Sequence, residues 1–100
     1  MLFADRIKQL REQKQMPQRQ LAAALEIDTA TYCKIERGER RAKREQVSTL
    51  ADLLETDKDQ LLNFWLAEQI YSVVKDEENA EKVLDIVHES VIEYKSGFKK

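Results

Sequence analysis

Basic side chains are concentrated in the first half of the chain, most densely between residues 34 and 44. Six of these eleven residues are lysine or arginine, namely Lys34, Arg37, Arg40, Arg41, Lys43 and Arg44. Guanidinium and ammonium groups bind phosphate. Residues 1–44 carry 11 Lys and Arg against 6 Asp and Glu, a net of +5, whereas residues 45–100 carry 6 against 13, a net of −7. This asymmetry favours a polyanionic partner for the first half, with a merely solvated charged surface as the alternative.

Other reactive side chains are too few to indicate catalysis. Cys33 is the only cysteine, which rules out an internal disulfide, and His88 is the only histidine. Neither residue has a ligand set or a nucleophile at a workable spacing, so the sequence predicts no catalytic residue, no metal site and no cofactor. A redox-sensing thiol at Cys33 is an alternative, although most single cysteines are inert.

Composition predicts an all-α protein, because the chain has only two glycines and one proline for tight turns. Apolar residues recur at helical spacing in six segments, at about 2–14, 18–25, 29–36, 44–54, 57–75 and 79–94. No apolar run approaches the roughly 20 residues of a membrane span, and no secretory signal is visible. We therefore expect a cytoplasmic protein without membrane contact.

The second and third helices form a distinctive pair. Pro17 ends the first segment and can precede a new helix, Asp28 is a good N-cap for the helix over 29–36, and Gly38 is a good left-handed stop. Two short helices joined by a few residues form the supersecondary pattern that places its second helix against DNA. The stretch Glu39–Arg44 is then a basic loop.

The block from Gln18 to Gly38, QRQLAAALEIDTATYCKIERG, resembles the helix-turn-helix of the Xre, or lambda-repressor-like, family. The resemblance covers about residues 3–62, since ERRA at 39–42, the leucines of the fourth helix and DQL at 59–61 fall in the same register. It implies a five-helix DNA-binding domain over residues 1–62 with a C-terminal helical extension over 63–100.

The resemblance also implies roles for single residues. Gln18 matches a phosphate-binding position, and the residues expected to approach base edges in the major groove are Thr29, Ala30, Cys33 and Lys34. Phosphate contacts are expected from Arg37, Arg40, Arg41, Lys43 and Arg44. Arg11 and Glu36 match a structural ion pair.

Three positions depart from the family pattern. Glu26 and Glu55 stand where relatives usually have glycine, and a left-handed residue other than glycine costs roughly 1 kcal/mol. Pro17 replaces the usual small capping residue before Gln18. We therefore expect turns there that differ or are strained.

The extension contains more apolar residues than one short neighbour can cover. We expect a homodimer interface that includes Phe64, Trp65, Leu66, Ile70, Val73 and Val74. The alternative is that the sixth helix folds back and covers these residues within one chain.

Together these features predict a transcriptional regulator that binds double-stranded DNA, at an inverted-repeat operator, as a homodimer. One alternative is an antitoxin or restriction-modification controller that also binds a protein partner. Another is an interaction adaptor that has lost DNA binding.

Overall fold

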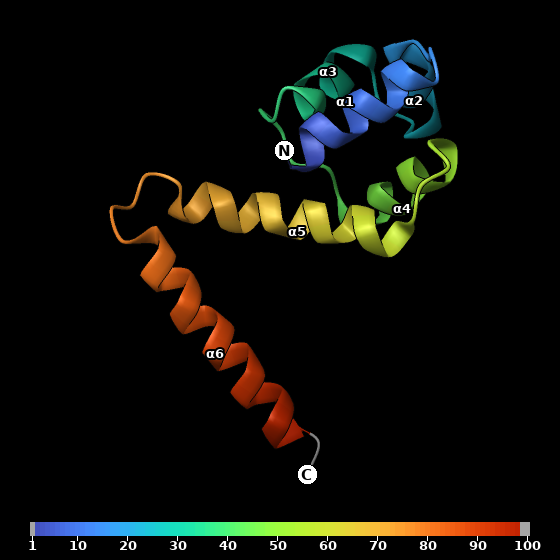
Figure 1. Cartoon of the computed structure of the whole chain (residues 1–100). Helices are drawn as coiled ribbons and strands as arrows, with labels where there is room; N and C mark the ends of the chain where they lie inside the picture. Colours follow the sequence, from blue (N-terminus) through green and yellow to red (C-terminus); the bar gives the residue numbers. More distant parts are fainter. Residues whose placement is uncertain (1, 99–100) are drawn as a thin grey trace. The chain divides into compact units, whose positions relative to one another are not determined.

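The computed structural model describes residues 2–98, and these form six α-helices and no strand (Figure 1). The helices are α1 (Phe3–Gln13), α2 (Gln18–Ala24), α3 (Thr29–Glu36), α4 (Arg44–Leu53), α5 (Lys58–Val74) and α6 (Ala80–Phe98). The predicted all-α fold class is confirmed. In this described part of the chain, no helix has the length and apolarity that a membrane crossing requires.

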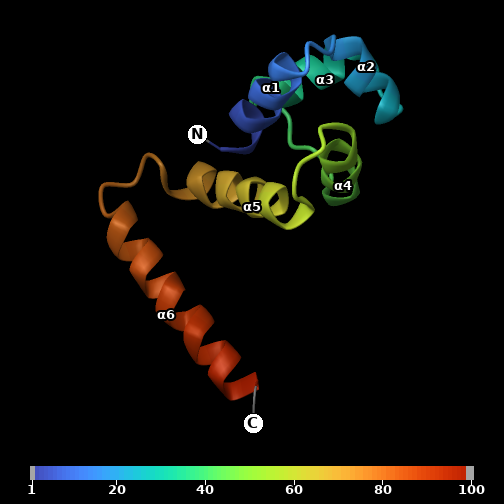
Figure 2. The same ribbon diagram turned by 45° about the vertical axis from the view of Figure 1, so that its right-hand side comes forward.

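The chain divides into two compact units, of which the first ends at Gln69 and the second begins at Ile70. The first unit holds α1 to α4 and most of α5, and Figure 2 shows α1 and α3 lying against each other. The second unit holds the end of α5 and α6. Three residues of the predicted domains lie outside the described residues. They are Met1, the first residue of the predicted domain 1–62, and Lys99 and Lys100, the last two of the predicted extension 63–100.

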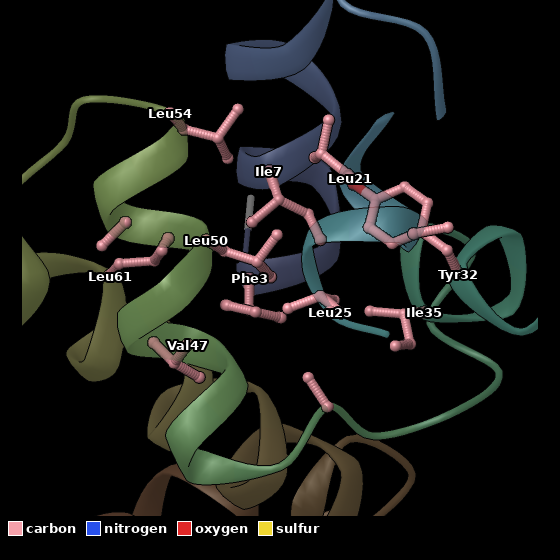
Figure 3. Packing of buried hydrophobic residues seen from close by; sticks show 13 residues of the cluster. Phe3, Ile7, Leu21, Leu25, Tyr32, Ile35, Val47, Leu50, Leu54 and Leu61 are labelled. Atoms are coloured by element: carbon pink, nitrogen blue, oxygen red, sulfur yellow. The ribbon is translucent and has the colours of Figure 1, made fainter. Parts of the chain in front are cut away.

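The core of the first unit receives side chains from all five of its helices (Figure 3). Its largest fully buried side chains are Phe3, Ile7, Leu21, Tyr32, Leu50, Leu54 and Leu61. Full burial of one large apolar side chain contributes roughly 1.5–3 kcal/mol relative to exposure. Because α3 adds both Tyr32 and Ile35 to this core, the face of α3 that remains outside is determined by packing.

Four helices end in the same way, with a left-handed residue. Gly38 after α3 has φ 75°, and the corresponding residues after α1, α2 and α4 are Gln15, Glu26 and Glu55, with φ of 54°, 58° and 53°. After α2, for example, the Ile27 N–H donates to the carbonyl of Ala22 at 3.0 Å, which satisfies a helix-terminal acceptor. Glu26 and Glu55 therefore adopt the left-handed conformation that favours glycine, and they bear the strain of a Cβ in that conformation.

Replacing Glu26 by glycine should relieve this strain. Glu26 is exposed and left-handed, so Glu26→Gly should raise the free energy of unfolding by about 1 kcal/mol in urea denaturation. The matched control is Glu12→Gly in α1, an exposed right-handed position where glycine should lower that free energy by about 1 kcal/mol. A loss of stability in both variants would contradict the prediction.

Candidate nucleic-acid interface

Helix α3 has one face in the core and one face outside. Tyr32 and Ile35 are buried, whereas Thr29, Ala30 and Lys34 are exposed. The exposed three are predicted base-contacting residues. Ala30 and Lys34 are neighbours on the helix surface because they are four residues apart, and Thr29 is the first residue of the helix. The fourth predicted member, Cys33, is half-buried.

The start of α3 is set by a side-chain cap. The carboxylate of Asp28 accepts a hydrogen bond from the Thr31 backbone N–H at 2.7 Å, as the sequence predicts for an N-cap. This hydrogen bond holds the pKa of Asp28 below its ordinary value, since it favours the ionised carboxylate. The cap therefore begins the helix directly before Thr29, the first residue of the exposed face.

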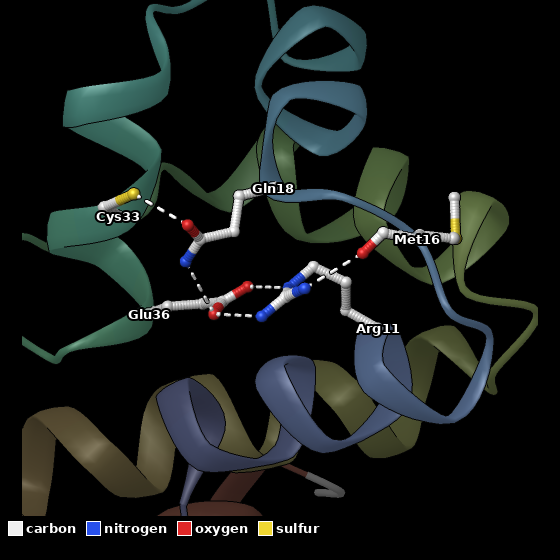
Figure 4. Close-up of polar contacts among 5 residues, drawn as sticks. All are labelled: Arg11, Met16, Gln18, Cys33 and Glu36. Atoms are coloured by element: carbon white, nitrogen blue, oxygen red, sulfur yellow. Dashed lines mark hydrogen bonds and ion pairs between the residues drawn. The ribbon is translucent and has the colours of Figure 1, made fainter.

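A polar network fixes α3 to α1 and α2 (Figure 4). The structure brings Arg11 and Glu36 together, with Arg11 Nε 2.6 Å from Glu36 Oε2 and Nη2 3.1 Å from Oε1. The side chains of this bidentate pair are 12% and 2% exposed. Arg11 Nη1 also donates to the Met16 carbonyl at 2.9 Å, which ties the end of α1 to the turn before α2.

Gln18 lies inside this network. Its Nε2 donates to Glu36 Oε1 at 3.2 Å, and its Oε1 accepts from Cys33 Sγ at 3.1 Å. The sequence had indicated each of these residues singly, but no spacing rule joins positions 18, 33 and 36 across two helices. The Gln18 side chain is thus engaged in positioning α3 in the free protein.

Burial and hydrogen bonding act in opposite directions on Glu36. Burial by itself would raise the pKa of this carboxyl, but hydrogen bonds to it, above all the one from Arg11, hold its pKa below the ordinary value. The same pairing raises the pKa of Arg11. Glu36 is therefore a buried anion whose charge is compensated by a neighbouring cation.

The segment from Arg37 to Arg44, which ends at the first residue of α4, presents the five basic residues of the predicted phosphate-binding set to solvent. All five are exposed, namely Arg37, Arg40, Arg41, Lys43 and Arg44. Arg37 Nε lies 2.8 Å from Glu39 Oε2, and this pair is more than half exposed, so it holds Arg37 only weakly. A small pocket of about 80 Å³ lies between α3 and the loop, and its lining includes Thr31, Arg40, Arg41 and Lys43.

Two contacts anchor the loop to the domain. The indole N–H of Trp65 donates to the Ala42 carbonyl at 2.8 Å, and the Gln46 amide oxygen accepts from the Lys43 backbone N–H at 2.8 Å. Ala42 itself is buried in the core. The basic side chains on either side of Ala42 therefore extend from an anchored backbone. The link from Trp65 has no signal in the sequence, because 23 residues separate it from Ala42.

The residues predicted to form a dimer interface have two different environments. Phe64 and Trp65 pack against the core of the first unit, and Val74 is 7% exposed. Leu66, Ile70 and Val73 are 39%, 46% and 75% exposed. Of the six, only these last three present a substantial apolar surface to solvent.

Among residues 2–98, no group of three or more His, Cys, Asp or Glu side chains is arranged to hold a metal ion. What α3 and its loop offer instead is a short helix with small and basic side chains, bordered by arginines and lysines. This arrangement suits recognition of a phosphate-bearing groove by contact and charge.

A family model described as a helix-turn-helix domain matches residues 2–64 of the chain. Comparison of the chain with curated proteins and with solved structures gave no match. The matched range contains α1 to α4, the basic loop and the first turns of α5.

The network around Glu36 predicts an acid-dependent stability. Because folding lowers the pKa of Glu36, its ionised form stabilises the fold fully above the ordinary glutamate pKa of about 4.3, and this contribution is lost as the pH falls through the lowered value. Glu36→Gln should remove that acid-dependent component. At pH 7 it should also lower the free energy of unfolding by about 3 kcal/mol, since it leaves the Arg11 charge buried without a counter-ion.

The matched control is Glu39→Gln, which breaks the exposed pair with Arg37. The measurement is the free energy of unfolding of both variants in urea between about pH 3 and pH 7, a range that includes the ordinary pKa of a carboxyl group. Glu39→Gln should change stability by less than about 1 kcal/mol at any of these pH values. Equal losses in the two variants would show that the buried pair has no special role.

Proposed function

The chain belongs to the helix-turn-helix domain family, and on this premise we propose that it is a cytoplasmic, sequence-specific DNA-binding transcriptional regulator. The observation that carries the proposal is the two-sided α3. Its inner face is held by the core and by the Arg11–Glu36 pair, while its outer face and the following loop are exposed and basic. No enzymatic role is part of the proposal.

In this proposal the outer face of α3 reads base edges in the major groove, whose width admits an α-helix. Lys34 donates to guanine O6 and N7, and Thr29 donates to a base or contacts a thymine methyl group. Ala30 allows close approach because its side chain is small. Cys33 also contributes to this face, and its thiol donates to the Gln18 amide oxygen in the free protein.

The basic loop supplies affinity rather than base choice. Arg40, Arg41, Lys43 and Arg44 contact phosphates from the anchored loop, and Arg37 does so by exchanging Glu39 for a phosphate oxygen at little cost. Gln18 completes the phosphate contacts at the start of α2. Because its amide already bonds Cys33 and Glu36, its backbone N–H is the group that we assign to this contact.

Two copies of the chain act together, so that each domain over residues 1–62 reads one half of an inverted-repeat operator. The extension over residues 63–100 joins the copies. Half-sites read by this motif lie about one helical turn of DNA apart, which requires a two-fold pair of recognition helices. Occupancy of the operator then regulates transcription by blocking or recruiting polymerase.

A second candidate is an antitoxin or restriction-modification controller, in which the extension also binds a different protein. The exposed apolar side chains of α6, such as Ile86 and Ile92 at 65% and 51%, favour this candidate. It keeps the same DNA-binding surface, so stoichiometric co-purification of a second protein separates it from the simple regulator.

Selection of duplexes from a random pool tests the proposed function directly. The expected result is enrichment of one inverted repeat, because a two-fold protein reads two identical half-sites. Recovery of a pool without sequence preference would refute sequence-specific regulation.

Two substitutions separate base reading from phosphate binding. Lys34→Ala should lower affinity for the selected operator by about 1–3 kcal/mol and relax the preference at one base pair. Arg41→Ala should weaken binding to all duplexes alike and reduce the slope of log K against log salt by about 1. Lys82→Ala, a change of the same kind in α6, is the control and should leave binding unaltered. Fluorescence anisotropy over a salt series measures all three, and wild-type behaviour of both site variants would refute the site.

A further inference from the structure

The helix α6 exposes an apolar stripe along its length. None of residues 81–97 is buried, and Leu84, Val87, Val91 and Tyr94 are 40%, 45%, 45% and 70% exposed. These four follow one another at intervals of three, four and three residues, so they lie on one face of the helix. An apolar stripe of this kind on a helix surface marks a site of association.

The spacing of the stripe reads the same in both directions along the helix. When two copies of α6 are set antiparallel, Leu84 comes opposite Tyr94 of the second copy and Val87 comes opposite Val91. Both pairings occur twice about a single two-fold axis. A surface that complements itself in this way can form an isologous interface between identical chains.

Charges along one edge of the stripe favour the same direction. Glu81, His88 and Lys95 are seven residues apart, so they form a row beside the stripe. In the antiparallel arrangement the same row on the second copy points in the opposite direction along the helix axis. Glu81 of one copy therefore lies near Lys95 of the other. A parallel pair would bring Lys95 near Ser90 of the second copy, which carries no charge. Antiparallel helices also set their dipoles in the favourable opposite sense.

We propose that α6 pairs antiparallel with α6 of a second copy of this chain, through Leu84, Val87, Val91 and Tyr94, with Glu81 and Lys95 forming two symmetric ion pairs at the edge. The inference rests on the proposed function, which requires two copies, and it assigns their contact to α6. The Phe64 and Trp65 side chains stay packed against the core of their own domain.

The first test is self-association of the full chain without DNA, measured by sedimentation equilibrium. The wild-type chain should dimerise at micromolar concentration, and Val87→Asp should weaken the dimer by about 100-fold or more, because it puts a charge into the apolar contact twice. Val87 is exposed in the single chain, so thermal unfolding of the two chains should agree at concentrations low enough for both to be monomeric. A wild-type chain that stays monomeric at hundreds of micromolar, or a Val87→Asp chain that dimerises like the wild type, overturns the proposal.

The second test concerns direction and uses two matched charge changes. At low salt, Lys95→Glu should weaken the dimer about tenfold, since it sets like charges together twice. Lys82→Glu changes the net charge equally but lies away from the stripe, so it should leave the dimer intact. Adding Glu81→Lys to Lys95→Glu should restore wild-type association. Equal effects of the two single changes, or no restoration in the double variant, overturn the antiparallel register.

These measurements are independent of the proposed function. A chain that dimerises in this way but shows no preference among duplexes would refute sequence-specific regulation alone. A chain that stays monomeric without DNA but still enriches one inverted repeat would refute the α6 pairing and leave the proposed function standing.

Discussion

The buried ion pair between Arg11 and Glu36 joins three helices at a single point. A carboxylate that is 2% exposed needs a compensating charge, and Arg11 supplies it from α1 while also bonding the Met16 carbonyl before α2. Gln18 then adds a hydrogen bond from α2 to the same carboxylate. Separating these helices would leave a charge buried without its partner. The orientation of α3 is therefore set by an interaction that tolerates little displacement. As a result, the outer face of α3 has one fixed orientation relative to α1 and α2.

The basic loop is also held by a polar group that needs a partner, in this case a neutral backbone carbonyl instead of a buried charge. Backbone polar groups near a core have to be satisfied, and the Ala42 carbonyl finds its donor in Trp65. This contact makes α5 part of the domain well beyond its first turn, consistent with a first compact unit that ends at Gln69. A loop with an anchored centre can hold several arginines near one another despite their repulsion. This is an advantage for a surface that has to receive phosphate groups.

The two halves of the chain use opposite surface chemistry. The first is basic and satisfies its apolar residues internally, whereas α6 carries an acidic surface with an apolar stripe that the single chain leaves exposed. Acidic side chains are unsuited to phosphate contact, so the separation of charge agrees with a separation of tasks. In the proposed arrangement, recognition belongs to α3 and its loop, and association belongs to α6.

Local interactions control the features that could be predicted correctly from the sequence. Helical spacing identified six helices with ends correct to within one residue, except that α6 runs to Phe98 instead of ending near residue 94. Asp28 and Gly38 marked the two ends of α3, because caps and stops act over three or four residues of chain. Family resemblance added the register of the exposed α3 residues. The hydrogen bonds of Gln18 with Cys33 and Glu36, and the packing of Trp65 against the core with its bond to Ala42, became visible only in the folded domain. Those contacts join residues 15 or more positions apart, and no periodicity specifies them, since they depend on how complete helices pack around shared side chains.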